Sequence, residues 1–416
     1  MKRLIIISIV LIVFLLALLL KRNVTSTTDK ATWWAFQSVD TMKYSRDASR
    51  EKLNDPSFDQ TIDTQVKNIA DTGATHVAIA TPYDEEFVPI LKRWVAAARK
   101  YHLNVWFRGN WSGWEKWFGY TGISREEHIT KTRDFILNHP GVFEDGDIFS
   151  GCPECENGGP GNPQITGDVR GYRKFLIDEY QVTKDAFIQI GKRVASNYFS
   201  MNGDVAKLIM DKPTTLALDG IVTIDHYVAS PDRLVLDIRA LAAQSGGRVV
   251  LGEFGAPILD IHGPMDEEAQ ARYLNETFRK LVSVDQLIGI NYWVSVGGST
   301  KLWNDDGNPR KAVSVITEYF TPRVITGHVI NQFRKPIANA EVSSVYRNVK
   351  TAIDGNFNLP IIEGDAAITI HVNGYTDKEL VINKNDLNIK IVMEKPYQNI
   401  IYMILDYIKS LFTKSP

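Results

Sequence analysis

The pattern of hydrophobic and polar positions changes twice along the chain, near residue 30 and near residue 321. Between these points, short apolar or β-branched runs alternate with longer segments whose apolar residues recur every three or four positions. The runs predict buried strands and the longer segments predict helices. Eight strands are expected, at 32–37, 75–80, 103–108, 147–151, 193–198, 220–225, 248–252 and 287–293.

Eight strand–helix pairs in roughly 290 residues fit the size of a (β/α)8 TIM barrel, which we place at 31–321. An open, doubly wound α/β sheet is the alternative for such an alternation. Sheets of that kind usually carry a Gly-rich phosphate-binding turn after their first strand, and no such turn follows 32–37. The sequence therefore favours the barrel.

Residues 322–396 have a different pattern. Apolar and polar residues alternate with period two in three short segments, and Asp-Gly, Glu-Gly and Asn-Gly pairs supply turns between them. We therefore predict a small all-β sandwich. The segments 327–329, 336–342, 351–357 and 374–375 resemble the carboxypeptidase regulatory-like, transthyretin-like module. That resemblance implies a non-catalytic spacer or binding accessory.

The last predicted element, at 397–416, is an amphipathic helix. Five apolar residues fall on one face at helical spacing: Ile400, Ile401, Ile404, Ile408 and Leu411. The segment is too short to cross a bilayer. It either caps the sandwich or forms a small contact between subunits, or it lies on a membrane surface.

The N-terminus predicts attachment to a membrane. An apolar run from Leu4 to Leu20 follows two basic residues, and its length is close to the roughly 17–25 residues that span a bilayer. We predict a transmembrane signal-anchor at 1–22 with a cytoplasmic N-terminus, a polar linker at 23–30 and an extracytoplasmic barrel. A cleaved signal peptide, which would give a secreted protein, is the alternative.

Composition limits the classes of partner. Hydrophobic residues make up 44% of the chain and charged residues 23%, which is ordinary for a globular protein. A net charge of -2 offers no basic surface, so nucleic-acid binding is excluded. Composition leaves the oligomeric state open.

The chain has only two cysteines, Cys152 and Cys155, in the sequence Cys-Pro-Glu-Cys. A zinc site would need more Cys or His ligands at suitable spacing, and the eight histidines are scattered, so we expect no metal and no cofactor. A local disulfide that stiffens the loop is one interpretation outside the cytoplasm. Two unpaired small hydrophobic residues are the other.

Carboxylates follow two of the predicted strands. Glu253 ends the seventh strand in Leu-Gly-Glu-Phe-Gly, and Glu154 and Glu156 follow the fourth strand in Gly-Cys-Pro-Glu-Cys-Glu-Asn. Barrel enzymes carry their catalytic groups at the carboxyl ends of the strands. Cleavage of a glycosidic bond needs two carboxyl groups, one that protonates the leaving oxygen and one that attacks or activates water.

These residues, together with others near strand ends, resemble clan A retaining glycoside hydrolases of the family 5 kind over residues 31–320. The further matches are His226 and Tyr227 after strand six, Trp293 after strand eight, and the segment 307–312 before the last helix. The resemblance implies that Glu253 is the nucleophile and that a strand-four glutamate is the acid/base. It implies that the other three residues orient the sugar and the nucleophile. Glu154 is preferred as acid/base because it is nearer the strand, and Glu156 is the fallback.

The sequence departs from that family at strand four, where the family carries Asn-Glu and this chain carries Pro153 before Glu154. Asn157 or Asn197 could replace the missing hydrogen bond to the sugar. The Trp-rich loop that begins with Arg108, Asn110 and Trp111 predicts a sugar-binding wall, or a loop that buries its own aromatic residues.

Trp34 completes the predicted substrate-binding set; Trp33 and Trp34 point in opposite directions along strand one, so at most one of them should face the barrel mouth. We expect a membrane-anchored glycoside hydrolase that acts on a poly- or oligosaccharide. Pro153 favours the alternative of a non-catalytic carbohydrate-binding or scaffolding protein on a degenerate barrel. A purely structural surface protein is a third hypothesis.

Overall fold

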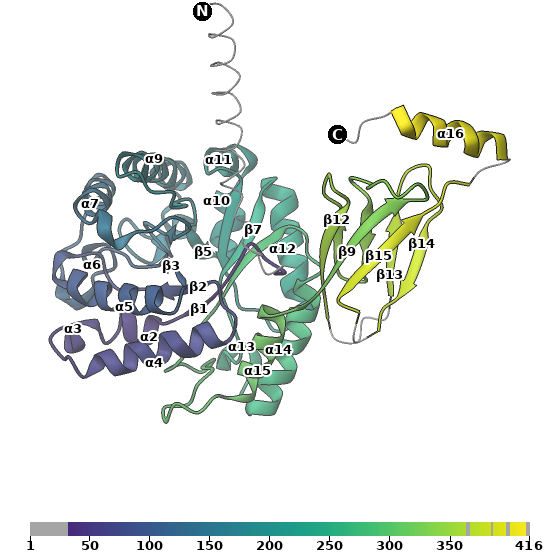
Figure 1. Ribbon diagram of the computed structural model, residues 1–416. Helices are drawn as coiled ribbons and strands as arrows, with labels where there is room; N and C mark the ends of the chain where they lie inside the picture. The colour runs from purple at the N-terminus through teal and green to yellow at the C-terminus, as the bar shows by residue number, and fades with distance from the viewer. Residues whose placement is uncertain (1–31, 363–366, 384–385, 397–399, 413–416) are drawn as a thin grey trace, which may run out of the picture. The chain divides into compact units, whose positions relative to one another are not determined.

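A computed structural model of the chain describes residues 32–362, 367–383, 386–396 and 400–412 (Figure 1). The predicted signal-anchor at 1–22 and the linker at 23–30 lie outside the described residues. Within the described ranges, no helix is both long enough and apolar enough to cross a bilayer.

Eight parallel strands form one sheet in the order β4-β3-β2-β1-β8-β7-β6-β5 (Figure 1). Each strand pairs with its sequence neighbour except β4 with β5, and β1 also pairs with β8, as in a barrel. The strands are β1 (Phe36–Asp40), β2 (His76–Ile79), β3 (Asn104–Phe107), β4 (Ile148–Phe149), β5 (Ser200–Asn202), β6 (Ile221–Asp225), β7 (Arg248–Phe254) and β8 (Leu287–Tyr292).

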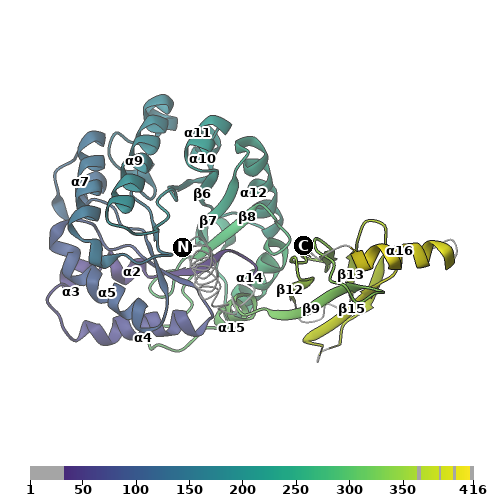
Figure 2. The ribbon, with the colours of Figure 1, turned by 45° about the horizontal axis from the view of Figure 1, so that its top comes forward.

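The gap between β4 and β5 is closed by the segment that precedes β5. Ile148 forms a parallel bridge with Ala195. The amide of Phe149 donates to the Ala195 carbonyl at 2.8 Å, and the Ala195 amide donates to the Asp147 carbonyl at 3.1 Å. The sheet is therefore a closed ring with helices outside it, in agreement with the predicted barrel (Figure 2).

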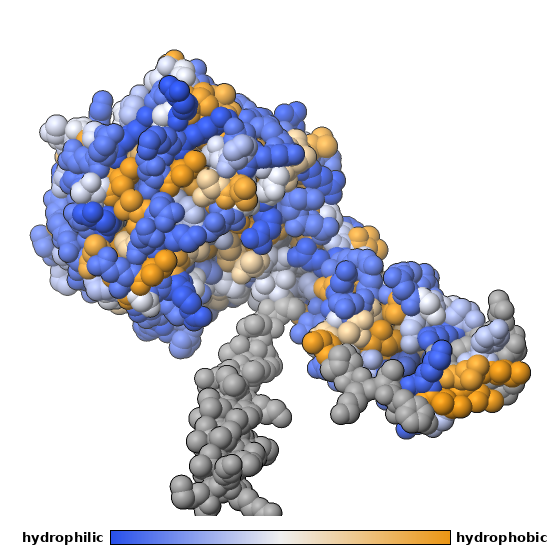
Figure 3. All heavy atoms as spheres, turned by 90° about the horizontal axis from the view of Figure 1, so that it is seen from above, coloured by the Kyte–Doolittle hydropathy of each residue, from blue (hydrophilic) through white to orange (hydrophobic). Residues whose placement is uncertain are grey.

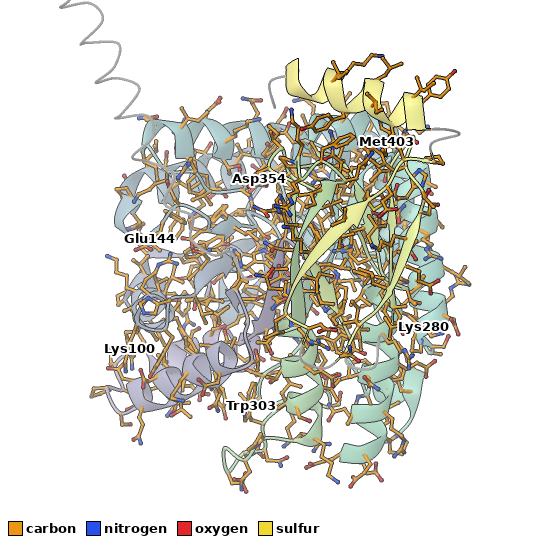
Figure 4. All side chains as sticks on the ribbon, turned by 45° about the vertical axis from the view of Figure 1, so that its right-hand side comes forward. Lys100, Glu144, Lys280, Trp303, Asp354 and Met403 are labelled. Atoms are coloured by element: carbon orange, nitrogen blue, oxygen red, sulfur yellow. A yellow bond between two sulfur atoms is a disulfide. The ribbon has the colours of Figure 1, made fainter. Side chains whose placement is uncertain are left out.

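Helices connect the strands on the outside of the ring, and charged residues such as Lys100 and Lys280 lie on their outer faces (Figure 4). The main helices are α4 (Phe58–Asp71), α5 (Val88–Lys100), α7 (Arg125–Asn138), α9 (Val169–Gln189), α10 (Gly203–Ile209), α11 (Lys212–Ala217), α12 (Pro231–Ser245), α14 (Glu267–Leu281) and α15 (Lys311–Phe320). Short helices lie in the loops: α2 (Met42–Ser45), α3 (Ser49–Lys52), η1 (Glu85–Phe87), α6 (Ser112–Glu115), η2 (Trp117–Gly119), η3 (Pro140–Val142), η4 (Cys155–Asn157), α8 (Pro163–Thr166) and α13 (Leu259–His262).

Local sequence sets the helix ends. The Ser230 side chain caps α12 by accepting from the Arg233 amide, Pro231 occupies the first helical turn, and Gly246 ends the helix at a φ of 68°. A hydroxyl cap, an N-terminal proline and a glycine in the left-handed region are the usual signals for a helix start and stop. These signals explain why the position of α12 can be predicted from the sequence.

Inside the barrel, large apolar side chains fill the half near the amino ends of the strands. Phe36 packs edge-on against Trp106 and Tyr198, with ring centroids 5.4 and 5.5 Å apart. Ile148, Ile221 and Val250 complete this buried cluster. The polar residues of the interior therefore gather at the other half, near the carboxyl ends.

Two strand predictions are wrong in their position along the sequence. The first strand is β1 (Phe36–Asp40) rather than 32–37, and the fifth is β5 (Ser200–Asn202) rather than 193–198. Both observed strands are rich in polar residues. In β1, for example, Gln37 and Ser38 are fully buried. Barrel strands that point polar groups inward lack the β-branched signature, so neighbouring apolar segments mimic them.

Beyond the barrel, two sheets form a β-sandwich, as the alternating pattern predicts. One sheet has the order β12-β9-β15 and the other β11-β10-β13-β14. Their buried faces share a core that includes Val329, Val342, Phe357, Ile370 and Ile391. The strands are β9 (Arg323–Asn331), β10 (Glu341–Ser343), β11 (Asn348–Lys350), β12 (Asn356–Ile361), β13 (Ala367–His371), β14 (Lys378–Val381) and β15 (Asn388–Met393). Membership of the carboxypeptidase regulatory-like family stays a prediction.

The predicted C-terminal helix is present as α16 (Ile400–Phe412). Large apolar side chains are exposed on it, and they form an apolar surface patch (Figure 3); Met403 is labelled in Figure 4. They are Ile401, Tyr402, Met403, Ile404, Leu405, Tyr407 and Ile408. Tyr407 of this helix packs against Phe333, with ring centroids 5.2 Å apart. Whether the exposed residues also contact another subunit or lipid stays a prediction.

Candidate active site

Charged side chains gather at the carboxyl ends of the barrel strands, which we call the mouth. Asp40 ends β1, Asp225 ends β6, Glu253 is the penultimate residue of β7, and Arg108 directly follows β3. Parallel strands of a barrel all end on the same face. These residues therefore meet in space although they are far apart in sequence.

The strand that carries Glu253 is irregular at the preceding glycine. Leu251 pairs with Ile224, but the next pair joins Glu253 to Asp225, so Gly252 is an extra residue on β7. A β-bulge of this kind re-aims the side chain beside it. A side chain at position 252 would also lie 2.4 Å from Asp225 Oδ1. The Gly-Glu order at the strand end therefore places two carboxylates side by side.

Arg108 is the cation that holds the buried carboxylates together. Its Nη1 lies 2.8 Å from Asp40 Oδ2 and 3.1 Å from Glu253 Oε1, and its Nη2 lies 3.2 Å from Asp225 Oδ2. Burial alone would lower the pKa of Arg108, but the three carboxylates together raise it above the usual value. One guanidinium faces three acidic groups, so this cluster keeps an excess of negative charge.

Replacement of Arg108 by methionine is expected to destabilise the protein by about 3–5 kcal/mol, because it leaves buried carboxylates without their cation. The pKa values of Glu253 and Asp225, which burial already raises above their unfolded values, would then rise further, because Arg108 opposes the rise at both. The loss should therefore be larger at pH 8 than at pH 5, where they can be protonated. Urea unfolding at both pH values measures it.

The matched control for this variant is Arg193→Met. The Arg193 side chain is 88% exposed and pairs with Asp145 at 2.8 Å, so its loss should cost at most about 1 kcal/mol. Equal effects of the two variants, or a loss at Arg108 that does not depend on pH, would contradict the role assigned to the buried cluster.

Some features around Glu253 favour its neutral form and others favour its charged form. Burial first, and then the neighbouring Asp225, raise the pKa of Glu253 to about 8. The Arg108 guanidinium and the Tyr227 hydroxyl oppose this rise, and that hydroxyl donates to Glu253 Oε2 at 2.9 Å. This carboxylate is therefore fixed in place by a cation on one oxygen and a hydrogen bond on the other.

Glu154 lies in the loop after β4 and reaches the same mouth. Burial first, and then the charges of Glu253 and Glu156, raise the pKa of Glu154 to about 8, although Arg108 opposes the rise. The influence of Glu253 means that the two carboxyls share one electrostatic environment. Among the described residues, no hydrogen bond or ion pair engages the Glu154 carboxyl, which is only partly buried.

Glu156 is held much more firmly. Its Oε1 accepts from the Asn202 amide at 2.6 Å, and its Oε2 accepts from the Tyr172 hydroxyl at 3.1 Å. The side chain is 4% exposed, and burial raises its pKa although these hydrogen bonds oppose the rise. Glu156 therefore ties the loop to the end of β5 and to α9, and both of its oxygens are engaged.

A polar network lies behind this loop. Asn110 donates through Nδ2 to Glu115 Oε1 at 2.7 Å, so its Oδ1 accepts from His128 Nε2 at 2.9 Å. His128 Nδ1 lies 3.2 Å from Glu179 Oε1, and both side chains are fully buried. Burial raises the pKa of Glu115 to about 7. Asn110 is 0% exposed, so it connects Glu115 to His128 inside the protein.

Trp111 and the tryptophans near it divide between core and mouth. Trp111 is 5% exposed and donates from Nε1 to Thr132 at 2.9 Å, so it packs under α7. Trp293 is partly buried at the end of β8, where its ring meets the Tyr227 ring edge-on with centroids 6.2 Å apart. The Lys43 ammonium lies 5.5 Å from the Trp293 ring centroid.

His226 supports the strand that carries the candidate nucleophile. Its amide donates to the Glu253 carbonyl at 2.8 Å, and its Nε2 lies 2.9 Å from Asp237 Oδ2 on α12. The side chain is 12% exposed. The structure thus brings together at the mouth most of the predicted site: Glu253, Glu154, Glu156, Arg108, His226, Tyr227 and Trp293.

Two predicted substrate-binding residues lie at the opposite end of the barrel. Trp34 precedes β1 and packs against Phe278 of α14, with ring centroids 6.0 Å apart. Asn197 precedes β5 and donates to the Leu218 carbonyl at 2.9 Å. Both positions follow from the shifted strands, because residues expected near the carboxyl end of a strand fall at its amino end. Neither reaches the mouth.

Sequence reasoning missed three acidic residues of the mouth, Asp40, Asp225 and Glu115. Asp225 ends the predicted strand at 220–225, so the criterion used for Glu253 could have found it, whereas Asp40 lies beyond the end of the strand predicted at 32–37. Glu115 carries no comparable signal, because it lies in the short loop helix α6 and is brought inward by Asn110.

One group of side chains has the composition of a metal site. His128, Cys152 and Glu179 bring possible ligand atoms within 4.8 Å of one another. Cys152 is bridged to Cys155, however, so the disulfide interpretation of this pair is confirmed and its sulfur is no thiolate ligand.

No protein-family model matches the sequence, and no curated protein matches it. Among solved structures, β-glucuronidase 2 of Bacteroides uniformis matches at 11% identity with a TM-score of 0.46, over 80% of this chain and 44% of that one. A structure of fungal β-1,4-galactanases matches at 15% identity with a TM-score of 0.48, over 68% of this chain and 99% of that one. A GH113 β-1,4-mannanase matches at 14% identity with a TM-score of 0.44, over 70% of this chain and 99% of that one.

The chain spans about half the length of the β-glucuronidases that it matches. At these identities and TM-scores the matches assign no activity to this chain, so we base its function on the residues of the mouth.

Proposed function

We propose that the protein is a glycoside hydrolase that cleaves O-glycosidic bonds of a poly- or oligosaccharide with retention of configuration. Glu253 is the nucleophile and Glu154 the acid/base, which is the pair of carboxyls that this chemistry requires. The observation that carries the proposal is their unequal environment at one mouth: Glu253 is held by Arg108 and Tyr227, and the Glu154 carboxyl is unbound.

The unequal environment decides which carboxyl holds the proton. Burial and neighbouring carboxylates raise the pKa of each group to about 8, with Glu253 acting on Glu154 and Asp225 acting on Glu253, so they cannot both be ionised easily near neutral pH. Arg108 favours the charged form of both groups, but of the two carboxyls only that of Glu253 also has a described hydrogen bond, from the Tyr227 hydroxyl. Glu154 is therefore the protonated partner, as a general acid must be.

In the first step, a carboxylate oxygen of Glu253 attacks the anomeric carbon while the bond from that carbon to the leaving oxygen breaks. Glu154 gives its proton to the leaving oxygen and becomes a carboxylate. The product is a glycosyl ester on Glu253. The negative charge that Glu253 gives up passes to Glu154, which lies near Arg108.

In the second step, the Glu154 carboxylate takes a proton from water, and the water oxygen attacks the anomeric carbon. The ester bond breaks, so Glu253 regains its negative charge and Glu154 its proton. The Tyr227 hydroxyl, 2.9 Å from Glu253 Oε2, remains available to that oxygen in both steps. Two inversions give net retention.

The residues around this pair supply the contacts for a sugar. The Trp293 and Tyr227 rings stand at the ends of β8 and β6, where an apolar sugar face can pack against them. Asn157 and Asn202 are exposed near Glu154 and are the amides available where Pro153 replaces the family's asparagine. Asn197, at the other end of the barrel, takes no part.

An extracytoplasmic location fits this proposal. The Cys152–Cys155 disulfide would persist in an oxidising compartment and would be reduced in the cytosol. The apolar run from Leu4 to Leu20 supports membrane attachment through an N-terminal anchor.

The stereochemical outcome tests the proposal. We expect proton NMR during cleavage of a reactive aryl glycoside to detect first the anomer with the configuration of the substrate, followed by slow mutarotation. A panel of glycosides with different sugars is needed, because the sugar is not fixed by the site. First appearance of the opposite anomer would overturn the double-displacement mechanism.

Pro153 at the position of the family's asparagine favours a second candidate, a carbohydrate-binding protein without turnover. It predicts calorimetric binding of an oligosaccharide to the full chain with no cleavage of any glycoside in the panel. It also predicts that binding survives replacement of both Glu253 and Glu154. The hydrolase proposal makes no such prediction.

A further inference from the structure

The loop that carries Glu154 has an unusual covalent feature. Glu154 lies inside the four-residue ring Cys152-Pro153-Glu154-Cys155, which the disulfide closes. Both cysteine side chains are buried, at 0% and 1% exposure. A ring this small limits the backbone angles of the two residues between its half-cystines.

Glu154 has a backbone conformation that non-glycine residues rarely adopt. Its φ is 46° and its ψ is 45°, in the left-handed region. A non-glycine residue stays there only when its surroundings hold it, and such residues gather at functional sites. The conformation of Glu154 is therefore imposed by the loop around it.

The ring is fixed on both sides by the body of the barrel. The Glu154 amide donates to the Ser200 carbonyl at 2.8 Å, and the Cys155 carbonyl accepts from Trp114 Nε1 at 3.1 Å. On the other side, Asn110 Nδ2 lies 3.6 Å from Cys152 Sγ. The neighbouring Glu156 adds two hydrogen bonds, which its carboxylate accepts from the Asn202 amide and the Tyr172 hydroxyl.

The Glu154 side chain contrasts with this well-anchored backbone. Within the described residues its carboxyl has no hydrogen bond or ion pair, so no polar contact fixes its position. The direction in which the backbone projects the side chain therefore has a large part in where the carboxyl points. Whatever holds the left-handed turn also helps to hold the carboxyl beside Glu253.

We propose that Cys152 and Cys155 are positioning residues, whose disulfide holds Glu154 in its left-handed conformation and so places its carboxyl opposite Glu253. This rests on the proposed function of Glu154 as acid/base. Opening the bridge removes the ring closure and lets φ of Glu154 move to negative values, which turns the carboxyl away from the mouth. The bridge is then part of the catalytic geometry and has more than a stabilising role.

If the bridge positions the acid/base, its loss should slow substrates with poor leaving groups much more than substrates with good ones. A misplaced acid/base fails to protonate the leaving oxygen, which matters for leaving groups of high pKa and hardly at all for dinitrophenolate, which leaves without a proton. A displacement of about 1 Å can cost on the order of 10²-fold in rate. A loss of stability alone would lower the activity on all leaving groups by the same factor.

The experiment compares the full-length protein with the double variant Cys152→Ala/Cys155→Ala on a series of aryl glycosides of one sugar. We expect kcat/KM to fall at least about 10-fold to 100-fold for the poorest leaving groups and less than about threefold for dinitrophenolate. Dithiothreitol should produce the same pattern in the unaltered protein. Its two thiols become a disulfide and pass two electrons and two protons to the cysteines, and reoxidation should restore activity.

A double-mutant cycle identifies the group that the bridge serves. In a Glu154→Gln background, removal of the bridge should cause no further selective loss, because the acid is already absent. A selective loss that persists in this background, or losses that are equal for all leaving groups, would overturn the positioning role. Circular dichroism and urea unfolding confirm that each variant is folded.

A second readout does not depend on turnover. The pKa of Glu154, followed by carbon-13 NMR of labelled glutamate and assigned with Glu154→Gln, should be near 8 in the bridged protein. It should fall toward the usual range when the carboxyl turns to water in the double variant. An unchanged pKa overturns the positioning proposal. Absence of turnover in the unaltered protein with a shifted pKa overturns the hydrolase and keeps the positioning.

Discussion

Glu253→Gln is expected to lower turnover of an aryl glycoside by about 10⁴-fold or more, since removal of a nucleophile that acts with a partner abolishes most catalysis. Glutamine keeps the size of the side chain and can still accept from Tyr227, but it cannot form the glycosyl ester. A 2-fluoro glycoside should label the unaltered protein once, on the peptide that contains Glu253. Mass spectrometry detects the label.

The same variant should be at least as stable as the unaltered protein. The pKa of Glu253 is raised from 4.5 to about 8, so its folded value exceeds its unfolded value. Such a group contributes a loss of stability that grows as the pH rises from about 4.5 to about 8. Glutamine removes that loss, and thermal unfolding at pH 8 should report a higher midpoint. Loss of activity is then separated from loss of fold.

The matched control is Glu276→Gln on α14, whose side chain is 58% exposed and lies 3.8 Å from Lys280. It should leave turnover and labelling unchanged. Turnover that survives Glu253→Gln, or a label on another residue, would remove Glu253 from the mechanism.

Glu154→Gln is expected to reduce kcat/KM by about 10²–10⁴-fold for substrates with poor leaving groups and to spare the first step for dinitrophenyl glycosides. In the unaltered protein, kcat/KM should fall as the pH rises through about 8, because Glu154 then loses the proton that it must donate. This alkaline fall should vanish in Glu154→Gln. Azide should restore turnover to Glu154→Ala and give a glycosyl azide of retained configuration.

Glu156→Gln distinguishes the two strand-four glutamates. Its carboxyl is engaged by Asn202 and Tyr172, so we expect a loss of about 1–2 kcal/mol in stability and little change in leaving-group dependence. The alkaline fall should stay where it is. If this variant, and not Glu154→Gln, removes the alkaline fall, the acid/base is Glu156.

Strand and helix alternation could be predicted because it depends on local pattern. β7 and β8 lie where the β-branched runs place them, and Glu253 stands at a strand end as expected. β1 and β5 could not be placed, because their polar residues point into the barrel and resemble loop sequence. That shift moved Trp34 and Asn197 to the wrong end of the barrel and hid Asp40.

The sequence by itself determined the strand and helix periods and placed Glu253, Glu154 and Glu156 as candidate carboxyls, because strand period and a glutamate at a strand end are local properties. Only the tertiary structure decided the environment of these carboxyls. Asp40, Arg108 and Asp225 come from three different strands, and closure of the barrel brings them onto Glu253. Proton affinity depends on burial and on charges across space, which no local pattern records.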